Sequence, residues 1–123
     1  SEEYRLHLEE EEYREIMKRE EKRFDSTIGE LLEVLEGVDG VDDAAVERMW
    51  NSLLTVLRVG VALGRCGENL LGLLEREGSM AHVERASVLE ILDEIISSCD
   101  SDGSAISEGV FKVVKRLREV LER

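Results

Sequence analysis

Apolar residues recur every three or four positions along most of the chain, which is the period of an amphipathic helix. The pattern predicts one helical segment that begins near Thr27 and three more that span residues 44–76, 80–98 and 105–122. Short stretches rich in Gly, Asp and Ser separate these segments, as expected for the loops between helices. The chain is therefore expected to be built from helices packed through their apolar faces.

The first part of the chain differs from the rest, because residues 2–23 carry 15 charges in 22 positions. Glu stands four residues ahead of a basic residue in Glu10/Arg14 and Glu15/Arg19, a spacing that supports an exposed helix. We expect residues 1–23 to be a charged helical extension and residues 24–123 to be the helical bundle core. The apolar residues of this first helix form a narrow stripe, which is the expected partner-binding surface: Tyr4, Leu8, Tyr13, Met17 and Phe24.

The stripe includes a weak coiled-coil pattern, in which Met17, Phe24 and Leu31 recur every seven residues. Thr27 followed three positions later by Glu30 fits a capping box, so a helix that restarts at Thr27 is an alternative to a continuous one. Further along, Asp42 or Asp43 can cap the next helix.

The segment 44–76 is the most apolar of the four and is expected to be central in the fold. Four glycines lie in its second half, and a break of the helix is expected near residues 64–67. Arg58, Arg65 and Glu68 argue against a membrane-spanning segment. Trp50, the only tryptophan, is expected to be a structural anchor, with an interface hot spot as the alternative.

Composition supports an all-α fold. The 123 residues contain no proline, 42% are hydrophobic and only 4% are aromatic, so Leu, Val and Ile must make up the core. The expected fold is a helical bundle of four long or five to six shorter helices, with the charged extension at its N-terminus.

Charge excludes some partners. A net charge of −13 disfavours nucleic acid and anionic membrane surfaces. One basic cluster lies in the last predicted helix, and acidic residues follow it closely: Lys112, Lys115, Arg116 and Arg118.

Catalytic and metal-binding patterns are not found. Cys66 and Cys99 are too few for a disulfide framework, and neither His7 nor His82 stands at a metal-ligand spacing from them. The carboxylates are spread over predicted solvent-facing positions, without a nucleophile motif or a phosphate-binding loop. We therefore expect no enzymatic activity, no cofactor and no metal. Free thiols and the lack of a signal-peptide pattern favour the cytoplasm or the nucleus.

Two short segments are similar to known binding motifs. Residues 100–104 resemble the start of an EF-hand calcium loop, but Ala105 and Phe111 stand where that loop has Gly and a bidentate Glu, so a capped turn is expected. The segment Val59, Leu63, Gly67, Glu68 and Leu70 resembles a BH3 segment of the Bcl-2 family, with Glu68 in place of the usual Asp. That resemblance implies docking of the apolar face in a partner's groove.

The three residues 78–80, Gly-Ser-Met, are also compatible with a junction between two joined segments. Taken together, the sequence predicts a non-enzymatic protein-interaction or assembly module that acts through helix packing and could form a homodimer. The alternative is a helical regulator with a Bcl-2-like or other groove-type interaction surface.

Overall fold

The structure, a computed structural model, describes residues 1–38, 42–77, 84–102 and 107–123, and for residues 99–102 the backbone only. The described residues form five helices and no strand, so the all-α prediction is confirmed and the larger of the two expected helix counts is the correct one. In chain order the helices are α1 (Glu2–Glu36), α2 (Asp43–Ala62), α3 (Glu68–Glu77), α4 (Arg85–Asp102) and α5 (Glu108–Glu122).

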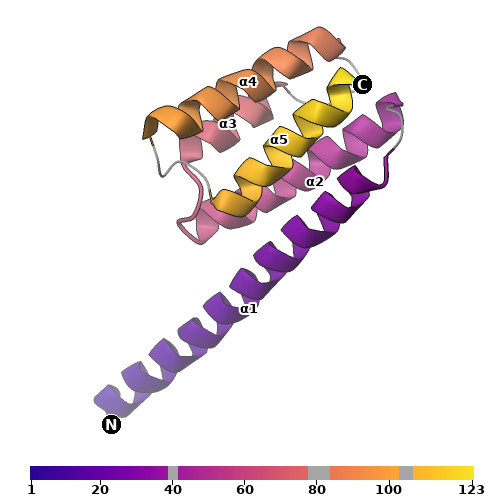
Figure 1. The fold of residues 1–123 in the computed structure, drawn as a ribbon. Coiled ribbons are helices and arrows are strands. Elements are labelled where there is room, and N and C mark those ends of the chain that lie inside the picture. The colour runs from indigo at the N-terminus through magenta and orange to yellow at the C-terminus, as the bar shows by residue number, and fades with distance from the viewer. Residues whose placement is uncertain (39–41, 78–83, 103–106) are drawn as a thin grey trace.

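The helices pack as a bundle around α5, which contacts both α1 and α4, while α2 contacts both α1 and α3 (Figure 1). Leucine, valine and isoleucine make up most of the interior, and no charged or polar side chain of the described residues is buried. Trp50 is fully buried among these residues, so its role as a structural anchor is confirmed. All five helices contribute apolar residues to this core.

Side chains before the first turn fix the beginning of three helices, and in α1 the Ser1 hydroxyl oxygen accepts a hydrogen bond from the backbone N–H of Tyr4 at 3.2 Å. The Asp42 carboxylate accepts a hydrogen bond from the backbone N–H of Ala45 at 2.6 Å, which confirms the prediction that Asp42 or Asp43 caps α2. The Ser107 hydroxyl oxygen accepts one from Val110 at 3.4 Å and caps α5. These bonds satisfy amides that have no partner within the helix.

The long apolar segment breaks between α2 and α3, as the glycines at residues 64–67 predict. Gly64 has φ +71°, a left-handed conformation that L residues with a side chain rarely adopt. The carbonyl oxygen of Gly60 accepts hydrogen bonds from the amides of both Arg65 and Cys66, at 2.7 and 3.2 Å. This turn brings Cys66 back against the last turns of α2.

The expected alternative of a restart at Thr27 is wrong, because α1 continues without interruption from Glu2 to Glu36. The Thr27 hydroxyl donates to the carbonyl oxygen of Arg23 at 2.7 Å and so bonds back to the preceding turn instead of capping a new helix. The consequence is visible in Figure 1, where the N-terminal half of α1 projects beyond the bundle as a single helix.

A charged contact joins α4 to α5. The Arg118 guanidinium donates to both carboxylate oxygens of Asp93, and it also binds Glu122 one turn further along α5. The hydrogen bond from Arg118 lowers the pKa of the Asp93 carboxyl below its ordinary value. Both side chains are accessible to solvent, so the contact orients the two helices more than it stabilises them.

We expect Gly60→Ala to destabilise the fold by about 1–3 kcal/mol, because an added Cβ would lie 2.5 Å from the Cys66 Sγ and 3.0 Å from the Phe24 ring. Urea denaturation followed by circular dichroism measures the change. The second substitution Cys66→Ala removes the Sγ and should recover part of the loss.

Gly29→Ala is the matched control, because a Cβ at this exposed helical position meets nothing within 4 Å. It should stabilise the protein by about 0.5–1 kcal/mol through helix propensity alone. If Gly60→Ala were also stabilising, the close approach of α2 to Cys66 would be refuted.

We expect Arg118→Met to raise the pKa of Asp93 back to its ordinary value. A carboxyl whose pKa is lowered by folding contributes stability above its unfolded pKa and loses it as the pH falls through the lowered folded value. The stability difference between wild type and variant should therefore be present at neutral pH and vanish in acid. Titration of the Asp93 carboxyl carbon by NMR measures the pKa, and equal titration curves would contradict the contact.

Candidate protein-interaction surface

The N-terminal segment of α1, residues 2–16, is exposed at every position. Five large apolar side chains lie on it in contact with solvent: Tyr4, Leu6, Leu8, Tyr13 and Ile16. Tyr4 and Tyr13 are 64% and 61% exposed. Outside this segment, the described residues contain one other large apolar side chain of this kind, Val34. We call residues 2–16 the projecting segment.

The stripe predicted from the sequence divides into two parts on the continuous helix. Each residue turns the helix by about 100°, so Tyr13 and Met17 lie nearly in line with the buried Phe24. Tyr4 and Leu8 lie on the other side, because the five-residue step from Leu8 to Tyr13 turns the helix by about 140°. The structure thus brings Tyr13 and Met17 together and separates Tyr4 and Leu8 from them.

Leu6, which the sequence-based stripe omits, belongs to the same face as Tyr13. It precedes Tyr13 by seven residues, two helical turns, and is 51% exposed. The heptad spacing that Met17, Phe24 and Leu31 display could have revealed it, since Leu6 and Tyr13 repeat that interval. The apolar face of the bundle therefore continues outward along α1 through Tyr13 to Leu6.

Phe24 has a different environment from the other predicted site residues. Its side chain is 1% exposed and lies in the core, where the guanidinium carbon of Arg65 sits 5.4 Å from the ring centre. This position leaves no surface of Phe24 for a partner. Phe24 is instead the first α1 residue that is buried in the bundle.

Arg65 fastens α1 to the turn between α2 and α3. Its guanidinium forms ion pairs with Asp25 at 3.0 Å and Glu21 at 3.6 Å, in addition to its contact with the Phe24 ring. Arg65 is 33% exposed, but Asp25 and Glu21 are 66% and 51% exposed, so solvent screens both ion pairs. These contacts join the middle of α1 to the turn that follows α2.

A pocket of about 290 Å³ lies where the projecting segment meets the bundle. Its walls combine α1 with the C-terminal end of α2, and apolar surface predominates in it: Met17, Glu20, Arg58, Val59, Ala62 and Leu63. We call it the junction pocket. Met17 is half-buried here, unlike the residues that precede it. An apolar side chain of another protein would make van der Waals contacts with the walls of this pocket.

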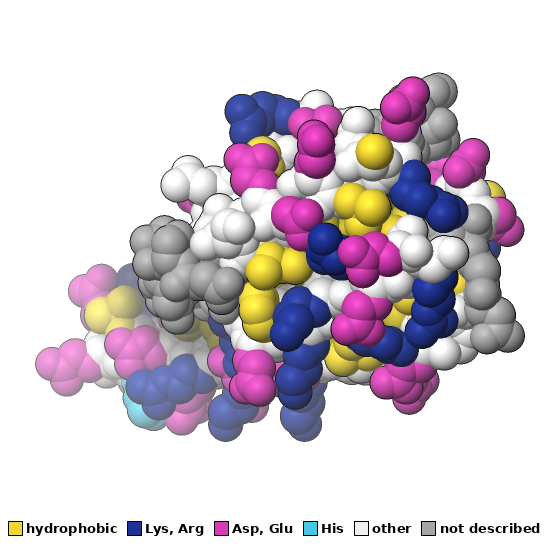
Figure 2. All heavy atoms as spheres, turned by 45° about the horizontal axis from the view of Figure 1, so that its top comes forward, with side chains coloured by type: hydrophobic (Ala, Val, Ile, Leu, Met, Phe, Trp, Pro, Cys, Tyr) yellow, Lys and Arg dark blue, Asp and Glu magenta, His cyan; other side chains and the backbone are white. Residues whose placement is uncertain are grey.

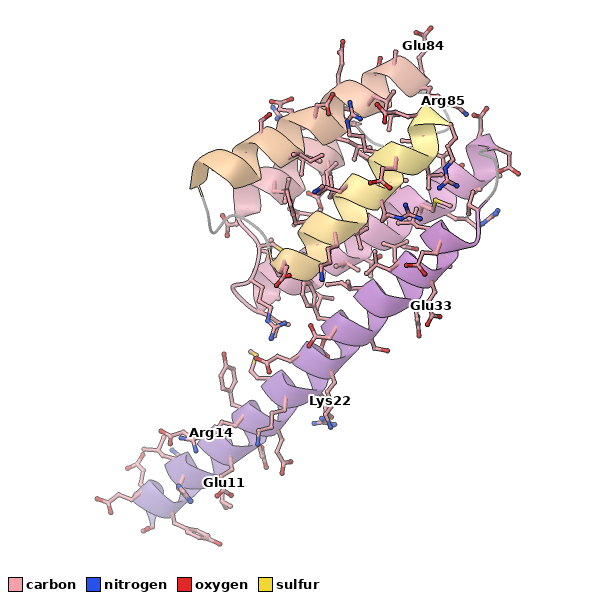
Figure 3. The ribbon with its side chains drawn as sticks, viewed as in Figure 1. Glu11, Arg14, Lys22, Glu33, Glu84 and Arg85 are labelled. Carbon is pink, nitrogen blue, oxygen red and sulfur yellow. The ribbon has the colours of Figure 1, made fainter. Side chains whose placement is uncertain are left out.

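The charges of α1 are segregated along the helix. Residues 2–12 hold six glutamates and one arginine, whereas residues 13–23 hold five basic residues and three glutamates. Glu11 and Arg14 lie on the projecting segment, beyond the bundle, and Lys22 lies on the following turns (Figure 3). Arg5 binds Glu2 and Glu9, and His7 binds Glu11.

The exposed helix that this spacing predicts is confirmed over residues 2–16, although the side chains of Glu10/Arg14 and Glu15/Arg19 do not come within 4 Å of each other. Fully solvated side chains gain little from such contacts and lose rotamer freedom on making them. Within the described part of the chain, the five basic side chains of residues 13–23 have no ion-pair partner.

A second depression, of about 340 Å³, lies between α1 and α2 on the bundle itself. Val34, 53% exposed, lines it together with Leu31, Val38, Ala45 and Met49. We call it the α1–α2 groove. It is the groove-type surface that the alternative function would use.

The other candidate sites are not formed as predicted, or they lie outside the described residues. The BH3-like segment does not form one helix, because α2 ends at Ala62 and α3 begins at Glu68. The turn expected over residues 100–104, the EF-hand-like loop, is wrong for residues 100–102, because their backbone continues α4 to Asp102; residues 103 and 104, the Gly-Ser-Met junction at residues 78–80, His82 and the Cys99 side chain lie outside the described residues.

Cys66 is a free, buried thiol, and burial raises its pKa, against smaller opposite effects of the Ser107 backbone hydrogen bond and the Arg65 charge. Among the residues that the structure describes, no group of three His, Cys, Asp or Glu side chains could hold a metal ion. In the same residues, no helix has the length and apolar content needed to cross a membrane.

The basic cluster of α5 is largely neutralised. Lys112 binds Glu108, Arg116 binds Glu119, and Lys115 lies over the Phe111 ring. The face of the bundle in Figure 2 shows acidic and basic side chains intermingled, with small apolar areas between them. No continuous basic surface is visible on this face.

Comparison of the chain with protein-family models, curated proteins and solved structures gave no match.

We expect Arg65→Ala to cost about 1–2 kcal/mol of unfolding free energy, because it removes two ion pairs and the contact with Phe24. Arg58→Ala is the matched control, since Arg58 is 56% exposed and forms a single ion pair, with Glu75. It should cost no more than about 0.5 kcal/mol. Urea denaturation of both variants gives the comparison, and equal losses would show that Arg65 does not anchor α1.

Proposed function

We propose that the protein is a non-enzymatic protein-interaction or assembly module, and that it binds a helix of its partner through the projecting segment of α1. The observation that carries this proposal is the exposure of the whole segment. All fifteen residues of this helical segment are exposed, although isolated helices of this length are marginal in water. Helices in proteins are stabilised mainly by packing of an apolar face, and here none of the described residues covers that face enough to bury it.

The arrangement of the apolar residues suits helix pairing. Leu6 and Tyr13 are two turns apart on one face, and Met17 completes a ridge that leads into the junction pocket. A partner helix laid along this ridge would bury Leu6 and Tyr13 and give the segment the packing it lacks. The contact is a short coiled-coil-like pairing of two or three apolar layers.

Other properties fit a binding role better than a catalytic one. The carboxylates of the described residues lie at the surface and not in a closed apolar pocket, where a general acid or base is expected. The net charge of −13 and the paired basic cluster of α5 disfavour nucleic acid. We place the protein in the cytoplasm or the nucleus, where a free thiol such as Cys66 stays reduced.

The second candidate function is that of a helical regulator that binds its partner in the α1–α2 groove. The half-exposed Val34 and the volume of the groove favour it. This surface is independent of the projecting segment, since it lies at the other end of α1. The two functions can therefore be separated by variants of one or the other surface.

We expect Leu6→Glu/Tyr13→Glu, and deletion of residues 1–16, to abolish partner binding without loss of the fold. The deleted residues are all exposed, so the bundle keeps its core. Binding is measured as concentration-dependent mass by light scattering, and as affinity capture of a defined partner from an extract of the source cells. Circular dichroism and urea denaturation report the fold.

Val34→Glu in the α1–α2 groove is the control and should leave binding intact. If binding survived deletion of residues 1–16 and was lost in Val34→Glu, the projecting segment would not be the binding surface and the groove would be.

A further inference from the structure

We propose that the partner helix of the projecting segment is basic, with lysine or arginine side chains on both sides of its own apolar seam. We call Leu6, Tyr13 and Met17, the residues on which this helix would lie, the apolar ridge. The inference rests on the proposed function and specifies the chemistry of the partner for the same surface.

The apolar ridge has one direction along α1. Because each residue turns a helix by about 100°, Tyr13 and Met17 lie within about 20° of the direction of Leu6. Phe24 follows Leu6 by about five turns and points in the same direction, into the core. The ridge is therefore the part of this face that the bundle leaves uncovered (Figure 1).

The charged residues beside the ridge all have the same sign. Six of the nine glutamates of residues 2–23 lie within about 60° of it. They stand on both sides, Glu2, Glu9 and Glu20 on one and Glu3, Glu10 and Glu21 on the other. All six basic residues of the same range lie at about 80° or more, on the rest of the helix surface: Arg5, Arg14, Lys18, Arg19, Lys22 and Arg23. A helix laid on the ridge therefore meets carboxylates along both of its edges.

Half of these six glutamates are without an ion pair. Arg5 binds two of the six, at 3.2 and 3.9 Å, and Arg65 binds a third at 3.6 Å. Among the residues that the structure describes, the other three form none: Glu3, Glu10 and Glu20. Residues beside the seam of paired helices decide which partner is chosen, through ion pairs between the helices. Lysine or arginine on the partner would supply the cations that these three carboxylates lack.

The junction pocket combines an apolar wall with a carboxylate in the same way. Val59 and Leu63 are among its apolar residues, and the half-buried Glu20 also lines it. Arg58 lines it as well, but its guanidinium is bound to Glu75 at 3.0 Å. A lysine or arginine of the partner can place its methylene groups against the apolar wall and its charge near Glu20.

A second copy of this chain is not complementary to the ridge. Two ridges placed face to face, in either orientation, would bring six glutamates of each copy to the seam, with Arg14, at about 80°, as the nearest basic residue. Like charges across an interface oppose association. The net charge of −13 acts in the same direction, since it repels another copy and attracts a basic protein.

Binding of designed helical peptides to the full-length chain tests the inference. The basic peptide is about three heptads long, with leucine at its seam, lysine on both sides of the seam and glutamine on the opposite face. A back-charged peptide exchanges the lysine and glutamine positions, and an acidic peptide has Glu in place of each Lys. Fluorescence anisotropy at low peptide concentration should show the basic peptide binding about tenfold or more tightly than the back-charged peptide, and the acidic peptide most weakly.

Two triple variants with the same change of net charge test the residues. The ridge variant reverses the three glutamates that form no ion pair: Glu3→Lys, Glu10→Lys and Glu20→Lys. The matched control reverses three that lie at about 120° or more from the ridge: Glu11→Lys, Glu12→Lys and Glu15→Lys. The ridge variant should bind the basic peptide about tenfold more weakly and should gain binding of the acidic peptide, whereas the control should keep the wild-type preference. A gain of binding excludes unfolding as the cause, and circular dichroism compares the helicity of the two variants.

The outcomes separate this inference from the proposed function. Equal binding of the basic and back-charged peptides, equal losses in the two variants, or no binding of the basic peptide would overturn the basic partner. A dimer of the unchanged chain that Leu6→Glu/Tyr13→Glu dissociates would overturn it too, with a second copy as the partner. In each case the proposed function stands if residues 1–16 are required for binding, and it fails if their deletion leaves partner binding intact.

Discussion

The packing of the C-terminal half of α1 on the bundle determines the rest of the molecule. Phe24, Ile28, Leu31 and Leu35 bury one face of the helix against α2 and α5. Because α1 contains no proline and no break, this burial also fixes the direction of the residues that precede Phe24. The C-terminal half of α1, which the core holds, thus supports an exposed N-terminal segment, and the apolar face of that segment continues the buried face of the C-terminal half.

Much of the fold could be predicted from residue types and spacing. Three features depend only on the types and spacing of neighbouring residues, which can be read from the sequence. They are the all-α class, the break at the glycines of residues 64–67 and the cap at Asp42. The continuity of α1 through Thr27 could not be predicted in the same way. A threonine followed by Glu fits both a capping box and a helix interior, and the choice is made by packing of the face that includes Phe24 and Ile28.

The candidate surface was predicted in part, for a related reason. Spacing along the sequence identified the charged first helix, but a stripe chosen by apolar character alone joined Tyr4 and Leu8 to residues on the opposite side of the helix. Which α1 residue is the first to be buried depends on where α2 ends, and that is a tertiary fact. The junction pocket is tertiary as well, since its walls come from residues about forty positions apart. The charge segregation, by contrast, can be counted from the sequence.

The anchoring of α1 links binding at the projecting segment to the stability of the bundle. A partner that packs beside Met17 also contacts the end of α2, close to the turn that Arg65 holds against Asp25. Any ligand that binds only the folded state stabilises it. A partner at this position would therefore stabilise the contact between α1 and the bundle. With few apolar layers and many solvated charges, such a contact is weak, rapidly reversible and sensitive to salt. The interaction proposed for the projecting segment would therefore be more sensitive to ionic conditions than a large apolar interface.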